Sequence, residues 1–119
     1  ISEGLEHQRI YRPWGNYEVL LESENCKVKH IIVHPNQRLS YQRHEKREEY
    51  WTIVKGTALV TLNDKDITLT TGDQIHIPLK ANHRIANKNT EDLIFIEIQR
   101  GTYFGEDDII RIEDDYNRN

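Results

Sequence analysis

Residues 42–56 read QRHEKREEYWTIVKG and residues 72–87 read GDQIHIPLKANHRIAN, and these two stretches decide the fold. Gln42 and His44 are two positions apart, so on a β-strand they project to the same side. Glu49 opens the next strand-like run after a short charged turn. A hairpin at that turn would bring Glu49 beside His44. The first stretch therefore predicts three polar side chains gathered at one place on a β-sheet.

The second stretch adds a histidine, because His83 opens a later run after the break at Pro78. Imidazole nitrogen, carboxylate oxygen and amide oxygen together suit a borderline divalent cation such as zinc, manganese or iron. Four protein ligands would leave a position for water or substrate, which a catalytic metal site needs. A single histidine in a β-protein is more often packed or exposed than a ligand. The prediction therefore depends on the whole set of Gln42, His44, Glu49 and His83.

Short β-like runs separated by turn residues fill most of the chain. The runs cover residues 16–22, 26–34, 39–44, 49–55, 57–62, 66–70, 74–77, 83–87 and 93–99. Their near-regular spacing predicts an all-β sandwich or barrel. Helical periodicity is missing until the acidic C-terminus, where we predict a strand and a helical turn over residues 106–115.

The 119 residues correspond to one ordinary domain, so we treat residues 1–119 as a single unit. Residues 1–10 are polar and aperiodic, and we predict an arm there. Residues 12–15 (RPWG) predict a turn, since proline fixes φ and glycine permits a tight bend. Residues 11–105 are predicted to form the barrel, and residues 106–119 a short acidic C-terminal tail.

Composition excludes several classes of protein. Sixteen basic and twenty acidic residues give a net charge of −4, which argues against nucleic-acid binding. The apolar runs are far shorter than the roughly 20 residues of a membrane span, and no secretory segment opens the sequence, so we expect a cytoplasmic protein without membrane contact. A single cysteine, Cys26, excludes an internal disulfide framework. The absence of methionine favours a piece excised from a longer protein.

Strand parity places a carboxylate among apolar side chains. In the last core run, Leu93, Phe95 and Glu97 share one face, while isoleucines occupy the other. A carboxylate on an apolar face must be paired, bound to a metal, or placed at an opening. Lys29, on an earlier run, is expected to face the same interior. Glu97 is thus either a chemically active group or the ion-pair partner of Lys29.

The two quoted stretches resemble the two motifs of the cupin superfamily, G-x5-H-x-H-x3,4-E-x6-G and G-x5-P-x-G-x2-H-x3-N. The corresponding residues are Asn36, Gln42, His44, Glu49, Gly56, Gly72, Pro78, Lys80, His83 and Asn87. Asn36 and Lys80 take glycine positions, so we expect Lys80 to need a positive φ. Gln42 replaces the first histidine. The resemblance implies a double-stranded β-helix, that is, a jelly-roll barrel.

A narrower resemblance covers residues 7–118. The matching segments are residues 11–15, 28–29, 39–44, 54–58, 77–78, 83–84, 96–99 and 101–111, with Arg47, Glu49, Trp51, Asn87, Asp114, Tyr116 and Arg118. They are similar to the isomerase domain of type II phosphomannose isomerases, often fused behind a mannose-1-phosphate guanylyltransferase. The family holds its metal with a glutamine, two histidines and a glutamate, which implies a divalent ion, zinc first, on Gln42, His44, Glu49 and His83.

The implied reaction interconverts mannose 6-phosphate and fructose 6-phosphate, which serves GDP-mannose supply for polysaccharide synthesis. It requires a metal to polarise oxygens, a base near C1 and C2, and cations for the phosphate. Glu97 is the first candidate base and His76 the second. Arg84 and Lys29 are the candidate cations. As alternatives, His76 faces solvent or packs, and Arg84 forms a surface ion pair.

Other residues of the matching segments are interpreted as structural. We expect Arg12 and Arg111 to tie the ends of the chain to the barrel. Residues 106–108 (EDD) are expected to cap a turn and form an ion pair with Arg12 or Arg118. Trp14, Trp51 and Tyr103 are predicted core or interface aromatics.

Two other functions stay open from the sequence. One is a non-catalytic cupin domain that binds a sugar phosphate or dimerises its parent protein, and the other is a cupin sugar epimerase. A small-molecule sugar phosphate is the expected partner in each case. The resemblance also implies a homodimer and a covalently linked guanylyltransferase domain.

Overall fold

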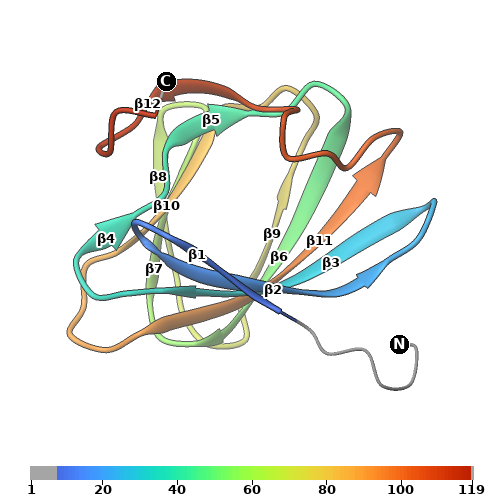
Figure 1. Cartoon of the computed structure of the whole chain (residues 1–119). Coiled ribbons are helices and arrows are strands. Elements are labelled where there is room, and N and C mark those ends of the chain that lie inside the picture. The colour runs from blue at the N-terminus through green and yellow to red at the C-terminus, as the bar shows by residue number, and fades with distance from the viewer. Residues whose placement is uncertain (1–7, 119) are drawn as a thin grey trace.

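The computed structural model describes residues 8–118, and the regular structure in that range is entirely β-strand (Figure 1). The strands are β1 (Arg9–Arg12), β2 (Gly15–Glu22), β3 (Cys26–Val33), β4 (Gln37–Arg38), β5 (Tyr41–Arg43), β6 (Arg47–Lys55), β7 (Ala58–Leu62), β8 (Lys65–Leu69), β9 (Gln74–Ile77), β10 (His83–Asn87), β11 (Leu93–Gly101) and β12 (Ile110–Glu113). One sheet has the order β1-β2-β3-β11-β6-β9 and the other β12-β5-β10-β7-β8, with β4 paired to β10. The predicted all-β architecture is confirmed. Within residues 8–118, no helix has the length and apolar character to cross a membrane.

The N-terminal segment joins the first sheet. Residues 1–7 of the predicted arm lie outside the described residues, but Arg9 and Ile10 form part of β1 and pair with β2. Pro13 and Trp14 connect the two strands, as the turn prediction required. Gly15 then packs its backbone on β3, where an added Cβ would lie 2.1 Å from the carbonyl oxygen of Ile32. Only glycine permits this close approach.

Two predicted elements differ from the structure. The predicted run at residues 39–44 is shortened to β5, and the two-residue strand β4 lies before it. Leu39, between the two strands, donates its backbone N to Ile85 O at 3.0 Å. The predicted helical turn near the C-terminus is wrong. Within residues 106–118, β12 is followed by a turn in which Asn117 N donates to Asp114 O.

Register between neighbouring strands builds an apolar layer inside the barrel. Leu93 of β11 is paired with Val33 of β3, and Phe95 is paired with Ile31 on one side and Ile53 on the other. All five side chains are buried. Trp14 and Trp51 belong to the same core cluster, as predicted, whereas Tyr103 is exposed and donates to Asp107.

The two residues that take glycine positions of the cupin motifs, Asn36 and Lys80, both have a positive φ. Asn36 has φ of 62° and Lys80 has φ of 65°, both in the left-handed region. Lys80 N donates to the carbonyl oxygen of His44, so this strained residue joins the turn before β10 to the end of β5. The two predicted halves of the metal cluster are thereby brought to one end of the barrel.

Candidate metal centre

A polar layer lies directly above the apolar one. Two residues beyond Phe95, Glu97 is paired with Lys29 of β3 and Trp51 of β6. Two residues further, Gln99 is paired with Glu49. β3 and β11 therefore become polar at Lys29 and Glu97, and β6 becomes polar one step later, at Glu49, so this end of the barrel collects buried ionisable groups.

Three of the four predicted ligands converge in this layer. His44, Glu49 and His83 are all buried, and their candidate ligand atoms lie within 4.8 Å of one another. The two imidazole rings are 5.0 Å apart between centroids. Trp51 Nε1 donates to Glu49 Oε1 at 2.9 Å, which holds the carboxylate in place.

Both imidazoles are oriented by backbone carbonyls. His44 Nδ1 lies 2.6 Å from Asp108 O, and His83 Nδ1 lies 3.0 Å from Ala81 O. A carbonyl oxygen only accepts, so each Nδ1 carries a proton and each Nε2 is the ring atom that can face a cation. In metal sites, a histidine that binds the metal through one ring nitrogen commonly donates the N–H of the other to a backbone carbonyl, which fixes the orientation of the ring. The donor set and its tautomers therefore fit a divalent cation such as zinc.

Gln42 is placed to complete the set. It is directly paired with His83 across β5 and β10, and its side chain lines the same cavity. Its Nε2 donates to Ser40 Oγ at 2.8 Å, which leaves the amide oxygen as the atom available to a cation.

Electrostatics act in opposite directions on the two histidines. Burial alone would lower the pKa of His44, but its hydrogen bond with Glu49 and the charge of that carboxylate raise it above the usual value. Burial lowers the pKa of His83 to about 4, so this imidazole is neutral near pH 7. Burial alone would raise the pKa of Glu49, but hydrogen bonding and charge from His44, with further charge from Arg47, hold it well below its usual range. His83 and Glu49 are thus in the forms that bind metal, a neutral imidazole and an ionised carboxylate, and a bound cation would displace the proton that His44 shares with Glu49.

Arg47 is a further site residue, which the sequence reasoning did not identify. Its Nε donates to Glu49 Oε2 at 2.9 Å, and its Nη2 lies 3.2 Å from His44 Nε2. Its Nη1 is buried and has no hydrogen-bond partner among residues 8–118. Arg47 precedes Glu49 by two positions on β6, so strand parity was the signal that would have found it.

Glu97 faces the metal cluster from the neighbouring strand. It is buried in the cavity lining, where Gln99 Nε2 donates to Glu97 Oε2 at 2.6 Å. Burial, reinforced by the negative charge of Glu49, raises the pKa of Glu97 to about 7. Lys29 Nζ donates to Glu106 Oε2 at 2.8 Å, so its hydrogen-bond partner is not the opposing Glu97.

The other predicted chemical residues are placed differently. His76 lies on the outer face of β9, half-exposed, where its ring stacks on Tyr50 and bonds to Glu48 at 2.6 Å. The structure thus keeps it out of the cavity, which corrects its choice as second base. Arg84 lines the cavity, but its Nη1 donates to Glu113 Oε1 at 2.6 Å.

The acidic segment at residues 106–108 has other partners than predicted. Glu106 accepts from Lys27 and Lys29, not from either predicted arginine. Asp108 does cap a turn, since its carboxylate accepts from the backbone N of Glu45 and Lys46. Arg118 pairs with Asp114 instead.

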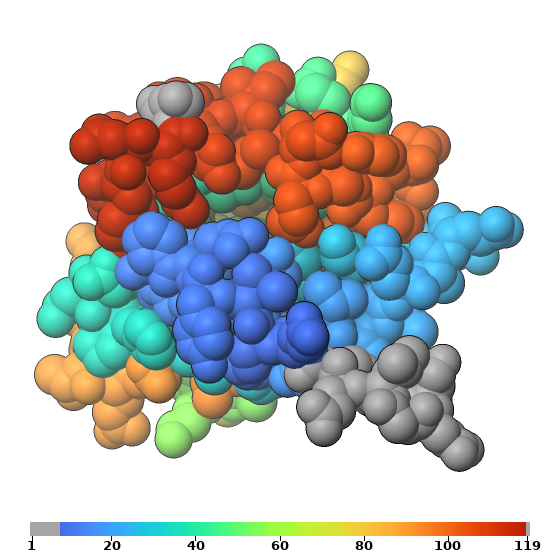
Figure 2. Space-filling view, viewed as in Figure 1, coloured from blue at the N-terminus to red at the C-terminus, as the bar shows by residue number. Residues whose placement is uncertain are grey.

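These groups surround one cavity of about 90 Å³. Figure 2 shows the hollow between the blue β1–β2 hairpin and the orange-to-red C-terminal segment, with interior strands visible at its base. The four predicted ligands and the three predicted chemical residues that reach it are Gln42, His44, Glu49, His83, Glu97, Lys29 and Arg84. The cavity therefore joins a candidate metal cluster, a carboxyl of raised pKa and several cations.

Solved structures share this fold. The capsular polysaccharide assembling protein CapF from Staphylococcus aureus matches with a TM-score of 0.79 at 17% identity, over 91% of this chain and 34% of that one. A conserved Klebsiella pneumoniae protein with a double-stranded β-helix domain matches with a TM-score of 0.76 at 22% identity, over 90% of this chain and 86% of that one. These likenesses confirm the double-stranded β-helix barrel.

Sequence relatives are more specific. The alginate biosynthesis protein AlgA of Pseudomonas aeruginosa is 47% identical over 98% of this chain and 24% of its own length. A mannose-1-phosphate guanylyltransferase of Klebsiella pneumoniae is 44% identical over 98% of this chain and 25% of its own length. The chain thus spans about a quarter of these relatives. A family model described as mannose-6-phosphate isomerase C-terminal matches residues 2–114, and the chain therefore belongs to that family.

Proposed function

We propose that this domain is a metal-dependent aldose–ketose isomerase that interconverts mannose 6-phosphate and fructose 6-phosphate. The observation that carries the proposal is the shared cavity of Glu97 and the cluster of His44, Glu49 and His83. Isomerisation needs a proton-transfer group beside a site that polarises the sugar oxygens. Family membership supports the same substrate pair.

A divalent ion held by Gln42, His44, Glu49 and His83 would polarise the carbonyl and hydroxyl oxygens at C1 and C2 of the sugar. Zinc is the ion that the two imidazoles and the carboxylate suit best. Trp51 and the backbone carbonyls of Ala81 and Asp108 keep these ligands oriented.

Glu97 then moves the proton. Its carboxylate removes the proton from C2 of the open-chain aldose, and the protonated Glu97 returns it to C1 of the enediol, while the O2 proton passes to O1. A carboxyl with a pKa near 7 is populated in both forms at neutral pH, as this double role requires. Gln99 donates to Glu97 and fixes the direction of its carboxyl group.

The relatives extend the proposal to the whole protein. Relatives of this chain are named as an alginate biosynthesis protein and a mannose-1-phosphate guanylyltransferase, and this chain covers about a quarter of each. We place the domain in a longer cytoplasmic enzyme in which a linked guanylyltransferase supplies GDP-mannose for polysaccharide synthesis. We also propose that the protein forms a homodimer.

The experiment compares two histidine variants of the same chain. His83→Ala should abolish both zinc binding and isomerisation of mannose 6-phosphate. His76→Ala, on the outer face, should leave both unchanged. Zinc content after dialysis and fructose 6-phosphate formation are the measurements. A wild-type domain that binds zinc but converts no substrate, even with its guanylyltransferase attached, would contradict the proposal and favour a binding domain. Production of a C2 epimer without ketose would instead identify an epimerase.

A further inference from the structure

Cations that line the cavity divide into two groups. Most have carboxylate partners: Lys29 pairs with Glu106, and Arg84 pairs with Glu113. Arg47 and Arg118 also form ion pairs, with Glu49 and Asp114. Only Arg12 and Arg111 line the cavity without an ion pair to any carboxylate among residues 8–118. Their positive charges are therefore available to an anion.

Arg111 approaches the cavity from the C-terminal strand. It is directly paired with Gln42 across β12 and β5, so both side chains lie on the same face of the sheet. Its Nη1 donates to the carbonyl oxygen of Arg118 at 3.2 Å. Its Nε is buried and has no hydrogen-bond partner among residues 8–118. A buried donor without a partner is rare, and a ligand oxygen would satisfy it.

Arg12 approaches the cavity from the N-terminal hairpin. It ends β1, next to the Pro13-Trp14 turn, and its side chain is exposed. Its hydrogen bond within the described chain is made by Nη1 to the carbonyl oxygen of the preceding Tyr11, at 3.0 Å. The guanidinium carbon lies 5.6 Å from the ring centroid of Tyr17, which itself lines the cavity. This contact holds Arg12 at the rim without neutralising it.

We propose that Arg12 and Arg111 bind the phosphate group of the sugar phosphate. The inference rests on the proposed function. It assigns the phosphate to Arg12 and Arg111 in place of Lys29 and Arg84, the candidate cations from the sequence. Guanidinium groups bind phosphate oxygens in paired, charge-assisted hydrogen bonds. A phosphate that used Lys29 or Arg84 would first have to displace Glu106 or Glu113. No such competition exists at Arg12 or Arg111 within the described chain.

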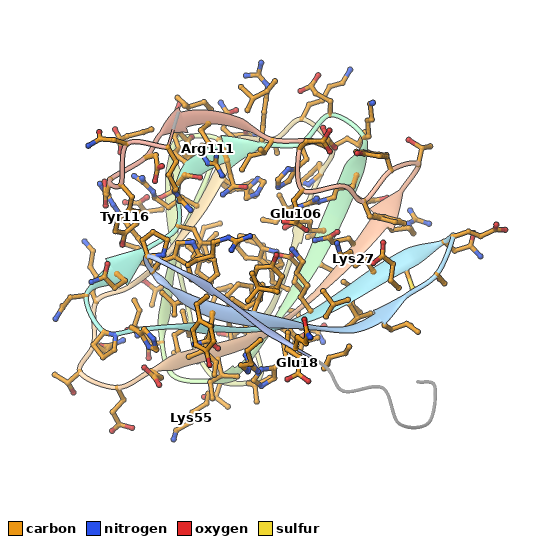
Figure 3. All side chains as sticks on the ribbon, viewed as in Figure 1. Glu18, Lys27, Lys55, Glu106, Arg111 and Tyr116 are labelled. Atoms are coloured by element: carbon orange, nitrogen blue, oxygen red, sulfur yellow. The ribbon has the colours of Figure 1, made fainter. Side chains whose placement is uncertain are left out.

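The position also suits the substrate. The phosphate is carried on C6, at the opposite end of the sugar from the reacting C1 and C2. When C1 and C2 lie at the metal cluster and Glu97, the phosphate lies toward the opening. Arg12 and Arg111 come from the two segments that border this opening, the β1–β2 hairpin and β12 (Figures 2 and 3).

The test measures binding, which does not depend on turnover. Isothermal titration of the full chain with mannose 6-phosphate, and with inorganic phosphate as a second probe, should show binding about 10- to 100-fold weaker in Arg12→Gln and in Arg111→Gln. Arg111→Lys should retain part of the affinity because it keeps the charge. Arg100→Gln, which removes an exposed arginine paired with Glu48, is the matched control and should bind like wild type. Affinity for unphosphorylated mannose should be the same in all variants.

The outcomes separate this inference from the proposed function. If the wild type isomerises the sugar phosphate, Arg12→Gln should raise KM and leave kcat nearly unchanged. If the wild type has no activity, even with its guanylyltransferase attached, the isomerase proposal fails while the phosphate site is still tested by titration. Unchanged phosphate affinity in Arg12→Gln, which alters an exposed side chain and does not threaten folding, would overturn the inference. A loss confined to Lys29→Gln and Arg84→Gln would overturn it as well.

Discussion

Replacing Glu97 by glutamine should make the metal-free protein more stable at neutral pH while removing its isomerase activity. The pKa of Glu97 is raised from 4.5 to about 7 by burial and by the charge of Glu49. An acid with a raised folded-state pKa holds its proton more tightly in the folded state. Its contribution to stability is fully present below pH 4.5 and is lost as the pH rises through 7.

The size of the effect follows from the shift. A change of one pKa unit corresponds to about 1.4 kcal/mol, so ionising Glu97 in the folded protein lowers the free energy of unfolding by about 3 kcal/mol at pH 8. Glu97→Gln keeps the shape and can still accept from Gln99, but it never ionises. We expect its Tm to match wild type near pH 4.5 and to exceed it by roughly 10 °C at pH 8.

Thermal unfolding followed by circular dichroism between pH 4.5 and 8, with chelator present, measures this difference. Glu48→Gln is the control, because Glu48 is an outward-facing carboxylate whose pKa is lowered, chiefly by its hydrogen bond from Arg100. Turnover of Glu97→Gln should fall by about 10²- to 10⁴-fold with its zinc content unchanged. A Tm difference that is constant with pH, or a variant less stable at pH 8, would refute the reasoning and show that the ionised Glu97 is compensated, for example by Lys29.

Three further results are expected. Gly15→Ala should lower the free energy of unfolding by about 3 kcal/mol in urea titrations, because its Cβ would lie 2.1 Å from Ile32 O; a loss below about 1 kcal/mol would show that β3 yields easily. Zinc at 100 times its Kd should stabilise the wild type by about 2.7 kcal/mol and His83→Ala not at all, as scanning calorimetry with and without chelator would show; equal stabilisation of both would place the zinc elsewhere. Glu106 has a pKa lowered to about 2, since its attraction to Lys29 and Lys27 outweighs burial, so its stabilisation is complete above pH 4.5 and is lost as the pH falls toward 2. The free energies of unfolding of Glu106→Gln and wild type should therefore become equal as the pH falls to 2. A difference between them that is largest at pH 2 would contradict this.

Much of the barrel and of its chemistry is determined by the sequence locally. Alternation on a strand has a period of two, so the inward position of Glu97 follows from Leu93 and Phe95 alone. The same rule would have placed Arg47 on the same face as Glu49. It would also have placed His76 on the outer face of β9, because the adjacent Ile77 points into the core. The spacing of residues 42–49 likewise placed Gln42, His44 and Glu49 together, because the turn between β5 and β6 is short. His83 joins them only because β10 pairs with β5 in the tertiary structure.

Tertiary structure decided which charges remain free. Lys29 and Arg84 were reasonable phosphate ligands until Glu106 and Glu113 were placed beside them, from positions 77 and 29 residues away in the chain. Arg12 and Arg111 looked like structural ties, yet both line the cavity without a carboxylate partner in the described chain. Pairing between distant segments depends on how an aperiodic tail crosses the barrel opening, and no local pattern of residues encodes that path.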